Sequence, residues 1–327
     1  MIKKLTTVLM TAALILNISG CFFTDSGKPS WYSTEAGGKG PGQTAYKGTT
    51  VFDPSYYPYF KMLSPAAQDA YAMIYDGLSA GQTNVKLSGG VSSKDIKDAF
   101  NMVLYDHPEL FWVRTDFNYS YVEVTGAVTS AQFNFYDFAS TPEALAKAKK
   151  DFDEAADKII AGAKKYNSAL EKELFIHDAV NKSAEFDVNA RYSQSAYSAL
   201  VTHKSVCAGY ARAFQYLMQK SGIPCYYCAG TVDGEAAAAN GGTDTSHSWN
   251  IVRTGITYCN VDCMWDDSVS NAYGKNQYPF FNLTDKDLLY HTRSGQSVNL
   301  PKCTDDSQSY SKRFGKTVEV KDLIFKK

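Results

Sequence analysis

The chain has 327 residues, of which 44% are hydrophobic, and a formal net charge of −1. Lys and Arg do not cluster beyond the first residues, so composition and charge favour no nucleic-acid partner. This length accommodates one large domain or two smaller ones. The sequence contains no internal repeat of the usual lengths and no phosphate-binding glycine loop.

The first twenty residues predict a secretory signal. Two lysines precede an apolar run over residues 5–18, which ends directly before Ser19-Gly20-Cys21. A basic start, a short apolar run and small residues before a cleavage point are typical of a signal peptide. With cysteine directly after Ser-Gly, residues 1–20 resemble a bacterial lipoprotein signal, which would make Cys21 the lipidated first residue of the mature chain. The alternative is an ordinary signal followed by a chance cysteine.

Residues 21–50 are rich in Gly, Ser, Thr, Lys and Pro and have no apolar periodicity, so we expect a disordered tether. Residues 51–140 have a globular composition and predict a smaller α+β region. Its predicted elements are a helix opening at Ser64-Pro65, a helix after Ser93 that stops at His107-Pro108, and strands near 117–124 and 131–138.

Residues 141–327 predict a second domain. A helix starts at Thr141-Pro142, and the next opens with a capping box at residues 168–171. A further helix is predicted after Ser205, which we expect to be its N-cap, and it ends near Gly222.

Cys207 falls in the first turn of this helix, where unpaired backbone N–H groups and the helix dipole favour an anion. Cysteine attacks as thiolate, so this position indicates a candidate nucleophile, with the Cys207 N–H as an oxyanion donor. A buried, small apolar residue is the alternative for a cysteine taken by itself.

Residues 246–253 and 256–264 predict two strands joined at Thr254-Gly255. In that register Arg253 pairs with Ile256 and His247 lies directly opposite Asp262, close enough for the carboxylate to orient the imidazole. Asp266 and Asp267 would lie beyond the partner strand.

Cys207, His247 and Asp262 can therefore act as nucleophile, base and orienting acid. Trp249 shares the strand face of His247 and is a candidate for shielding the site or binding an acyl or oxyanion group; core packing is equally open. Residues 234–245 are the best candidate for a mobile loop beside the site. The other histidines lack such a partner pattern and are interpreted as structural or surface residues: His107, His177, His203 and His291.

These motifs resemble the transglutaminase-like superfamily, with similarity over residues 165–295. They are Cys-Ala-Gly-Tyr-Ala from Cys207, His-Ser-Trp-Asn from His247 and Asn-Val-Asp-Cys-Met-Trp-Asp-Asp ending at Asp267. The resemblance implies an α+β, papain-like core in which the nucleophile helix packs on an antiparallel sheet. Three residues depart from the family pattern without removing a catalytic atom: Ala208, Ser248 and Cys263.

Five further cysteines are expected mainly as buried thiols. One bridge between the strands at 225–230 and 257–264 is the alternative, and a zinc site is a weaker third. We expect no metal and no cofactor. The residues are Cys225, Cys228, Cys259, Cys263 and Cys303.

The resemblance implies a cysteine enzyme that acts on amide bonds through a thioester. Water as acceptor gives a peptidase or amidase and an amine gives a protein-glutamine acyltransferase; the three candidate residues serve both. The Cys21 anchor would place the enzyme at the outer face of a bacterial membrane, with cell-wall peptides or extracellular proteins as expected substrates. The alternative is a non-catalytic surface binding or assembly module that keeps the fold.

Overall fold

The computed structural model describes residues 9–14, 52–234 and 245–323. The described residues do not include Cys21, the tether or most of the predicted signal, so these remain predictions. They also leave out residues 235–244, so the predicted mobile loop at 234–245 remains a prediction as well. Among the helices of the described residues, none has the length and apolar character that a membrane span requires.

The chain divides into two compact units, with the division between Leu145 and Ala146, inside helix α3 (Pro142–Ala163). The sequence predicts a boundary between residues 140 and 141. In the first unit two helices accompany a four-stranded antiparallel sheet of order β1-β3-β4-β2. Its elements are β1 (Leu9–Leu14), α1 (Pro65–Ser79), β2 (Asn84–Lys86), α2 (Ser93–Asp106), β3 (Val113–Val122) and β4 (Val128–Phe135), with 3₁₀ turns at Tyr59–Met62 and Asp137–Ala139.

Side-chain caps start both helices of this unit. The Ser64 hydroxyl accepts a hydrogen bond from the Ala67 N–H, with Pro65 at the first helical position. Helix α2 is capped by Ser92, one residue before the predicted start, in a capping box with Asp95. The buried rings of Phe100, Phe117 and Phe133 form the aromatic core between α2 and the sheet.

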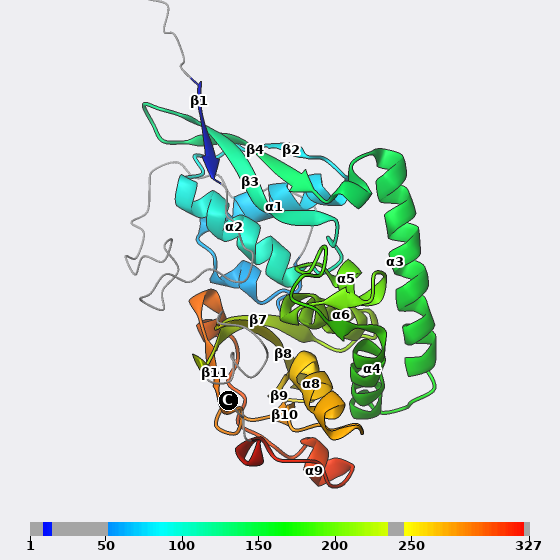
Figure 1. Ribbon diagram of the computed structural model, residues 1–327. Coiled ribbons are helices and arrows are strands. Elements are labelled where there is room, and N and C mark those ends of the chain that lie inside the picture. Colours follow the sequence, from blue (N-terminus) through cyan, green and yellow to red (C-terminus); the bar gives the residue numbers. More distant parts are fainter. Residues whose placement is uncertain (1–8, 15–51, 235–244, 324–327) are drawn as a thin grey trace, which may run out of the picture. The chain divides into compact units, whose positions relative to one another are not determined.

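The second unit is built on a five-stranded antiparallel sheet of order β10-β9-β8-β7-β11, against which helix α6 packs (Figure 1). The predicted α+β class and the helix-on-sheet core are confirmed. Its further elements are α4 (Ala169–Ser183), β5 (Glu185–Phe186), α5 (Ala196–Leu200), β6 (Lys204–Ser205), α6 (Cys207–Lys220), β7 (Cys225–Val232), β8 (Ser246–Thr254), β9 (Thr257–Val261), α8 (Cys263–Tyr273), β10 (Phe281–Leu283), β11 (His291–Arg293) and α9 (Tyr310–Arg313), with 3₁₀ turns at Gly295–Asn299 and Val320–Asp322.

The register of the β8–β9 hairpin differs from the prediction by two residues. Thr254 pairs with Thr257, so the loop is Gly255-Ile256 instead of Thr254-Gly255, and His247 is not directly opposite Asp262. The loop takes this position because Gly255 adopts φ +68°, a conformation that glycine accepts without strain. A shift of two leaves every side chain on its predicted face, because the side-chain period of a strand is two.

Strand β9 ends at Val261, three residues earlier than predicted, because Asp262 caps helix α8. Its carboxylate accepts the Trp265 N–H at 3.0 Å. Cys263 therefore begins a helix and is not a strand residue.

The predicted N-cap of α6 is also wrong. Val206 occupies that position, and the Ser205 hydroxyl is 2.5 Å from the Ser198 hydroxyl instead. A Cβ on Gly209 would lie 1.9 Å from the Ser205 Oγ. The glycine of the Cys-Ala-Gly-Tyr motif thus allows the first turn of α6 to lie against these two serines.

Candidate active site

Cys207 is the first residue of α6 and is partly exposed, as a free thiol. Backbone N–H groups of a first helical turn have no partner within the helix, and the helix dipole places partial positive charge there. This is an environment that favours a thiolate and an adjacent oxyanion.

His247 lies on β8 and is 2% exposed. Its Nε2 is 2.5 Å from Oδ2 of Asp262, and the Cys207 thiol lies close enough to the imidazole to affect its pKa. Burial lowers the pKa of His247, but the Asp262 charge, its hydrogen bond and the Cys207 contact together raise the pKa to about 10. The structure therefore brings the three predicted residues together in the order thiol, imidazole, carboxylate.

Asp262 is buried, and both of its carboxylate oxygens accept hydrogen bonds. Oδ1 takes the Trp265 N–H of the helix it caps, while Oδ2 faces two imidazoles, those of His247 and His291, the latter at 3.1 Å. Burial alone would raise the pKa of Asp262, but the two histidines hold it below its ordinary value. Asp262 thus contacts His247 from the N-cap of α8, whereas the sequence predicted a contact between paired strands.

His291 was interpreted as a structural or surface residue, and the structure instead places it in the site. Its side chain is 0% exposed and reaches Asp262 from β11, a strand of three residues. Neither alternation nor a turn signal marks so short a strand in the sequence, and only its pairing with β7 brings it here.

Trp249 forms a buried wall of the site. Its ring lies nearly parallel to that of His247, with centroids 6.1 Å apart, and the Trp265 ring approaches from another side at 5.4 Å. The Trp249 indole N–H donates to Oδ1 of Asn260 at 3.1 Å. Because that N–H already donates to Asn260, it is not the oxyanion donor considered for Trp249. The indole ring itself covers the His247 imidazole.

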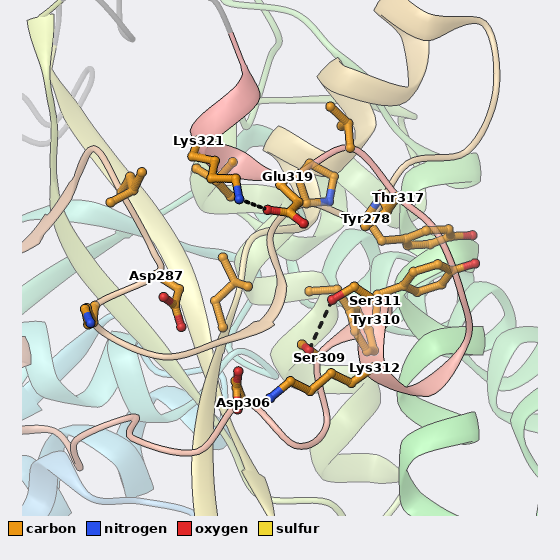
Figure 2. A pocket seen from close by; sticks show the side chains of 17 residues that line it. Tyr278, Asp287, Asp306, Ser309, Tyr310, Ser311, Lys312, Thr317, Glu319 and Lys321 are labelled. Atoms are coloured by element: carbon orange, nitrogen blue, oxygen red, sulfur yellow. Dashed lines mark hydrogen bonds and ion pairs between the residues drawn. The ribbon is translucent and has the colours of Figure 1, made fainter.

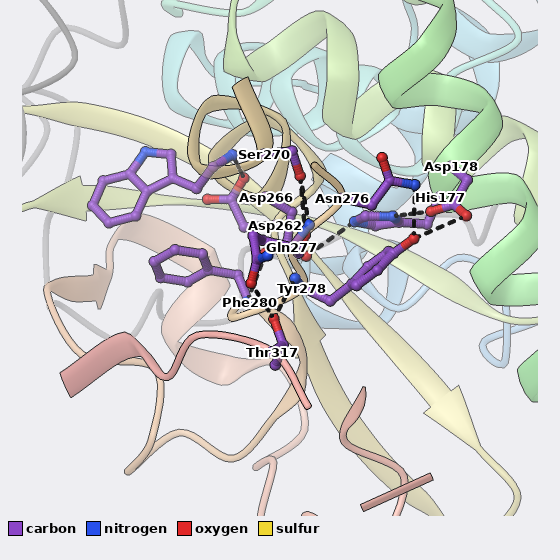
Figure 3. Close-up of polar contacts among 11 residues, drawn as sticks. His177, Asp178, Asp262, Asp266, Ser270, Asn276, Gln277, Tyr278, Phe280 and Thr317 are labelled. Atoms are coloured by element: carbon purple, nitrogen blue, oxygen red, sulfur yellow. Dashed lines mark hydrogen bonds and ion pairs between the residues drawn. The ribbon is translucent and has the colours of Figure 1, made fainter. Parts of the chain in front are cut away.

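A second histidine–carboxylate pair lies next to the site (Figure 3). His177 Nε2 is 3.0 Å from Oδ2 of Asp266, whose Oδ1 accepts the Phe280 N–H at 2.8 Å. The Tyr210 hydroxyl donates to Asp267 at 2.9 Å and so joins α6 to α8. The two acids that follow Asp262 thus hold α8 in place and do not contact His247.

The other five described cysteines are buried, free thiols, and none forms the alternative bridge. Burial raises the pKa of each, to about 12 for Cys228 and about 11 for Cys259. Within residues 52–234 and 245–323, one group of three His, Cys, Asp or Glu side chains has donor atoms within 4.8 Å of one another; it is His247, Asp262 and His291 and contains no cysteine. Hydrogen bonds already join these three side chains.

Three cavities lie away from Cys207. One of about 450 Å³ lies beside β10 and the C-terminal segment and includes Tyr278 and Tyr310 (Figure 2). A second of about 510 Å³ lies against α4 and α8, and a third of about 460 Å³ lies between α3 and α4. None of these three cavities is lined by Cys207, His247 or Asp262.

The family model described as the transglutaminase-like superfamily matches residues 153–263. No curated protein matches the chain. Among solved structures, the chain is similar to a crystal structure of a TGase, with 13% identity, 46% of this chain and 44% of that one covered, and a TM-score of 0.31. It is also similar to a candidate cysteine protease from Cytophaga hutchinsonii, with 15% identity, coverage of 45% and 61%, and a TM-score of 0.28.

A third similar structure is the periplasmic domain of TgpA from Pseudomonas aeruginosa bound to ethylmercury, with 13% identity, coverage of 47% and 63%, and a TM-score of 0.29. The chain thus spans less than two thirds of each of these three proteins. Residues 153–263 form a transglutaminase-like domain.

Proposed function

We propose that this protein cleaves or transfers amide-linked acyl groups through a thioester on Cys207. The observation that carries the proposal is the buried His247, which contacts the carboxylate of Asp262 and lies beside a thiol at a helix N-terminus. This is the arrangement that nucleophilic cysteine catalysis requires.

In the first half-reaction the Cys207 thiolate attacks the amide carbonyl carbon and forms the C–S bond. The carbonyl oxygen becomes an oxyanion beside the first turn of α6. When the C–N bond breaks, the His247 imidazolium gives its proton to the departing amine. Asp262 remains ionised and holds the imidazolium in place.

In the second half-reaction the acceptor gives a proton to His247 and attacks the thioester carbon. The C–S bond breaks and the thiolate–imidazolium pair is restored. Water as acceptor releases a carboxylic acid, and a primary amine yields a new amide. The three residues act in the same way with either acceptor, so both outcomes belong to the proposal.

The substrate and location follow from the predicted N-terminal features. A lipid on Cys21 and the tether that follows it would hold the enzyme at the outer face of a bacterial membrane. Peptides of the cell wall and proteins of the extracellular space are the amide substrates found there. We therefore propose one of these as the acyl donor.

The proposal is tested by trapping the acyl-enzyme. The purified protein is mixed with a peptide library or a cell-wall digest, quenched in acid and examined by peptide mass spectrometry for a thioester on Cys207. A fluorescent primary amine, added in a parallel reaction, distinguishes transfer from hydrolysis. Cys207→Ala is the matched control and should carry no adduct. Absence of any adduct or turnover across these substrates would favour a non-catalytic binding module.

A further inference from the structure

His291 is positioned by a strand remote in sequence from the rest of the site. It opens β11, where it pairs with Val232 of β7, and β7 in turn pairs with β8 so that Gly230 faces His247. The sheet therefore presents the two imidazoles from strands on either side of β7. Their ring centroids are 5.1 Å apart at an interplanar angle of 66°.

Both ring nitrogens of His291 face hydrogen-bond acceptors. Nε2 is 3.1 Å from Oδ2 of Asp262, and Nδ1 is 2.9 Å from the carbonyl oxygen of Leu289. A neutral imidazole carries a single N–H, so it can donate to only one of them. The carboxylate is the stronger acceptor because it is charged, and the tautomer with the proton on Nε2 is therefore favoured.

The charged groups that face His291 are Asp262, at the start of α8, and His247, on β8. Burial lowers the pKa of His291, and the His247 charge lowers it further, against the opposite effect of Asp262. One carboxylate thus serves two imidazoles. His247 holds the positive charge, and neutral His291 supplies the second N–H to the same oxygen.

We propose that His291 is a positioning residue for the acyl transfer described above, donating from Nε2 to Asp262 and holding that carboxylate against His247. This inference rests on the proposed function. Without this donor the Asp262 oxygen would have one fewer buried hydrogen bond, and its alignment with His247 would loosen. Hydrogen bonds to charged groups have the strength to make this a roughly 10- to 100-fold effect on kcat.

Two substitutions separate the donor from the bulk of the ring. His291→Leu removes the N–H, whereas His291→Gln keeps an amide N–H near the position of Nε2. Thr292→Leu, on the exposed neighbour in β11, controls for general loosening of that strand. For each variant, kcat, KM, the pH profile and the unfolding midpoint are measured.

We expect His291→Leu to lower kcat by about 10- to 100-fold with KM unchanged and to move the alkaline limb of the profile to lower pH. His291→Gln should recover most of the kcat and reverse most of the shift in the alkaline limb. Thr292→Leu should have the kcat and the pH profile of the wild type. Wild-type kcat and profile in folded His291→Leu would overturn the proposal. So would a His291→Gln variant that folds and behaves as His291→Leu does.

A measurement on the unsubstituted protein covers the case in which the variants do not fold. Imidazole ¹⁵N NMR at neutral pH should show a proton on Nε2 of His291, and an unprotonated Nε2 would contradict the proposal. Elemental analysis belongs with it, because stoichiometric zinc would show that the two imidazoles bind a metal instead. Neither measurement needs a substrate, so failure of the positioning role can be told apart from failure of the proposed function.

Discussion

Two histidine–aspartate pairs lie one helical turn apart on α8, and they differ in the third group that each histidine meets. Asp262 caps the helix and holds His247, while Asp266, one turn further, holds His177. Both pairs are buried. Residue type and burial therefore do not distinguish a candidate catalytic pair from a structural one.

The two pairs differ in the group that each histidine contacts besides its aspartate on α8. His247 meets the Cys207 thiol, a nucleophile that can exchange a proton with it. His177 meets a second carboxylate, that of Asp178, at 3.3 Å, and the rings of Tyr278 and Phe281 lie against it. The proposed acyl transfer uses the first pair, whereas the second joins helices α4 and α8.

Replacing each histidine by alanine should give the largest contrast. His247→Ala removes the proton acceptor and donor, and activity should fall by about 10³-fold or more with the fold retained. His177→Ala, assayed at a temperature where it is folded, should keep kcat within several-fold of the wild type. The comparison is made by kcat and circular dichroism on the same preparations, and equal losses of kcat in the two variants would contradict the division of roles.

Replacing the acids should give a smaller contrast in activity with a distinct pH signature. Asp262→Asn removes the charge that raises the pKa of His247, so the alkaline limb of the kcat profile should move below pH 10, and kcat should fall by about 10²-fold or more. Asp266→Asn should leave that limb in place. Rate profiles from pH 5 to about pH 10.5 check this, and an unshifted limb in Asp262→Asn would show that another group sets it.

The stability of the second pair should depend on pH in a defined direction. Burial lowers the pKa of His177, but the hydrogen bonds and charges of Asp178 and Asp266 raise it from 6.5 to about 9. The contribution of His177 protonation is therefore complete below pH 6.5 and is lost as the pH rises through about 9.

His177→Ala should be less stable than the wild type by about 3–5 kcal/mol at neutral pH, since it leaves a buried carboxylate unpaired. The difference in unfolding free energy between the two should shrink from pH 7 to pH 10. Because His247 also has a raised pKa in both proteins, its contribution cancels in this difference. Urea unfolding at each pH measures it, and a difference that grows with pH would refute the assignment.

The candidate site could be predicted from sequence where its residues lie in local patterns. The helix that starts at Cys207 and the alternation around Trp249 come from short-range patterns, and they place the thiol and the imidazole. The predicted hairpin loop lies one residue too early, which shifts the pairing register by two, because Thr254-Gly255 and Gly255-Ile256 both contain the glycine that the turn needs. The two registers place the strand residues on the same faces, but the contact of His247 with Asp262 comes from the cap of α8 and not from strand pairing.

The positions of Asp262 and His291 in the site could not be predicted from local sequence, because they depend on tertiary structure. Asp262 acts from a helix cap, and its Asp-x-x-Trp segment was interpreted as a continuing strand. His291 reaches the site through strand pairing between β7 and a three-residue strand about sixty residues later in the chain. No short-range pattern encodes such a contact.

Alkylation of Cys207 as a function of pH tests the central claim most directly, because it needs no substrate. With iodoacetamide and peptide mass spectrometry, Cys207 should react first and already at mildly acidic pH, while the buried cysteines, whose pKa values are raised, stay protected. His247→Ala should move Cys207 labelling to higher pH, and His177→Ala in its folded range should not. If Cys207 reacts no faster than Cys225 or Cys263, or has the same profile without His247, the thiol–imidazole pair does not exist and the binding-module alternative becomes the better account.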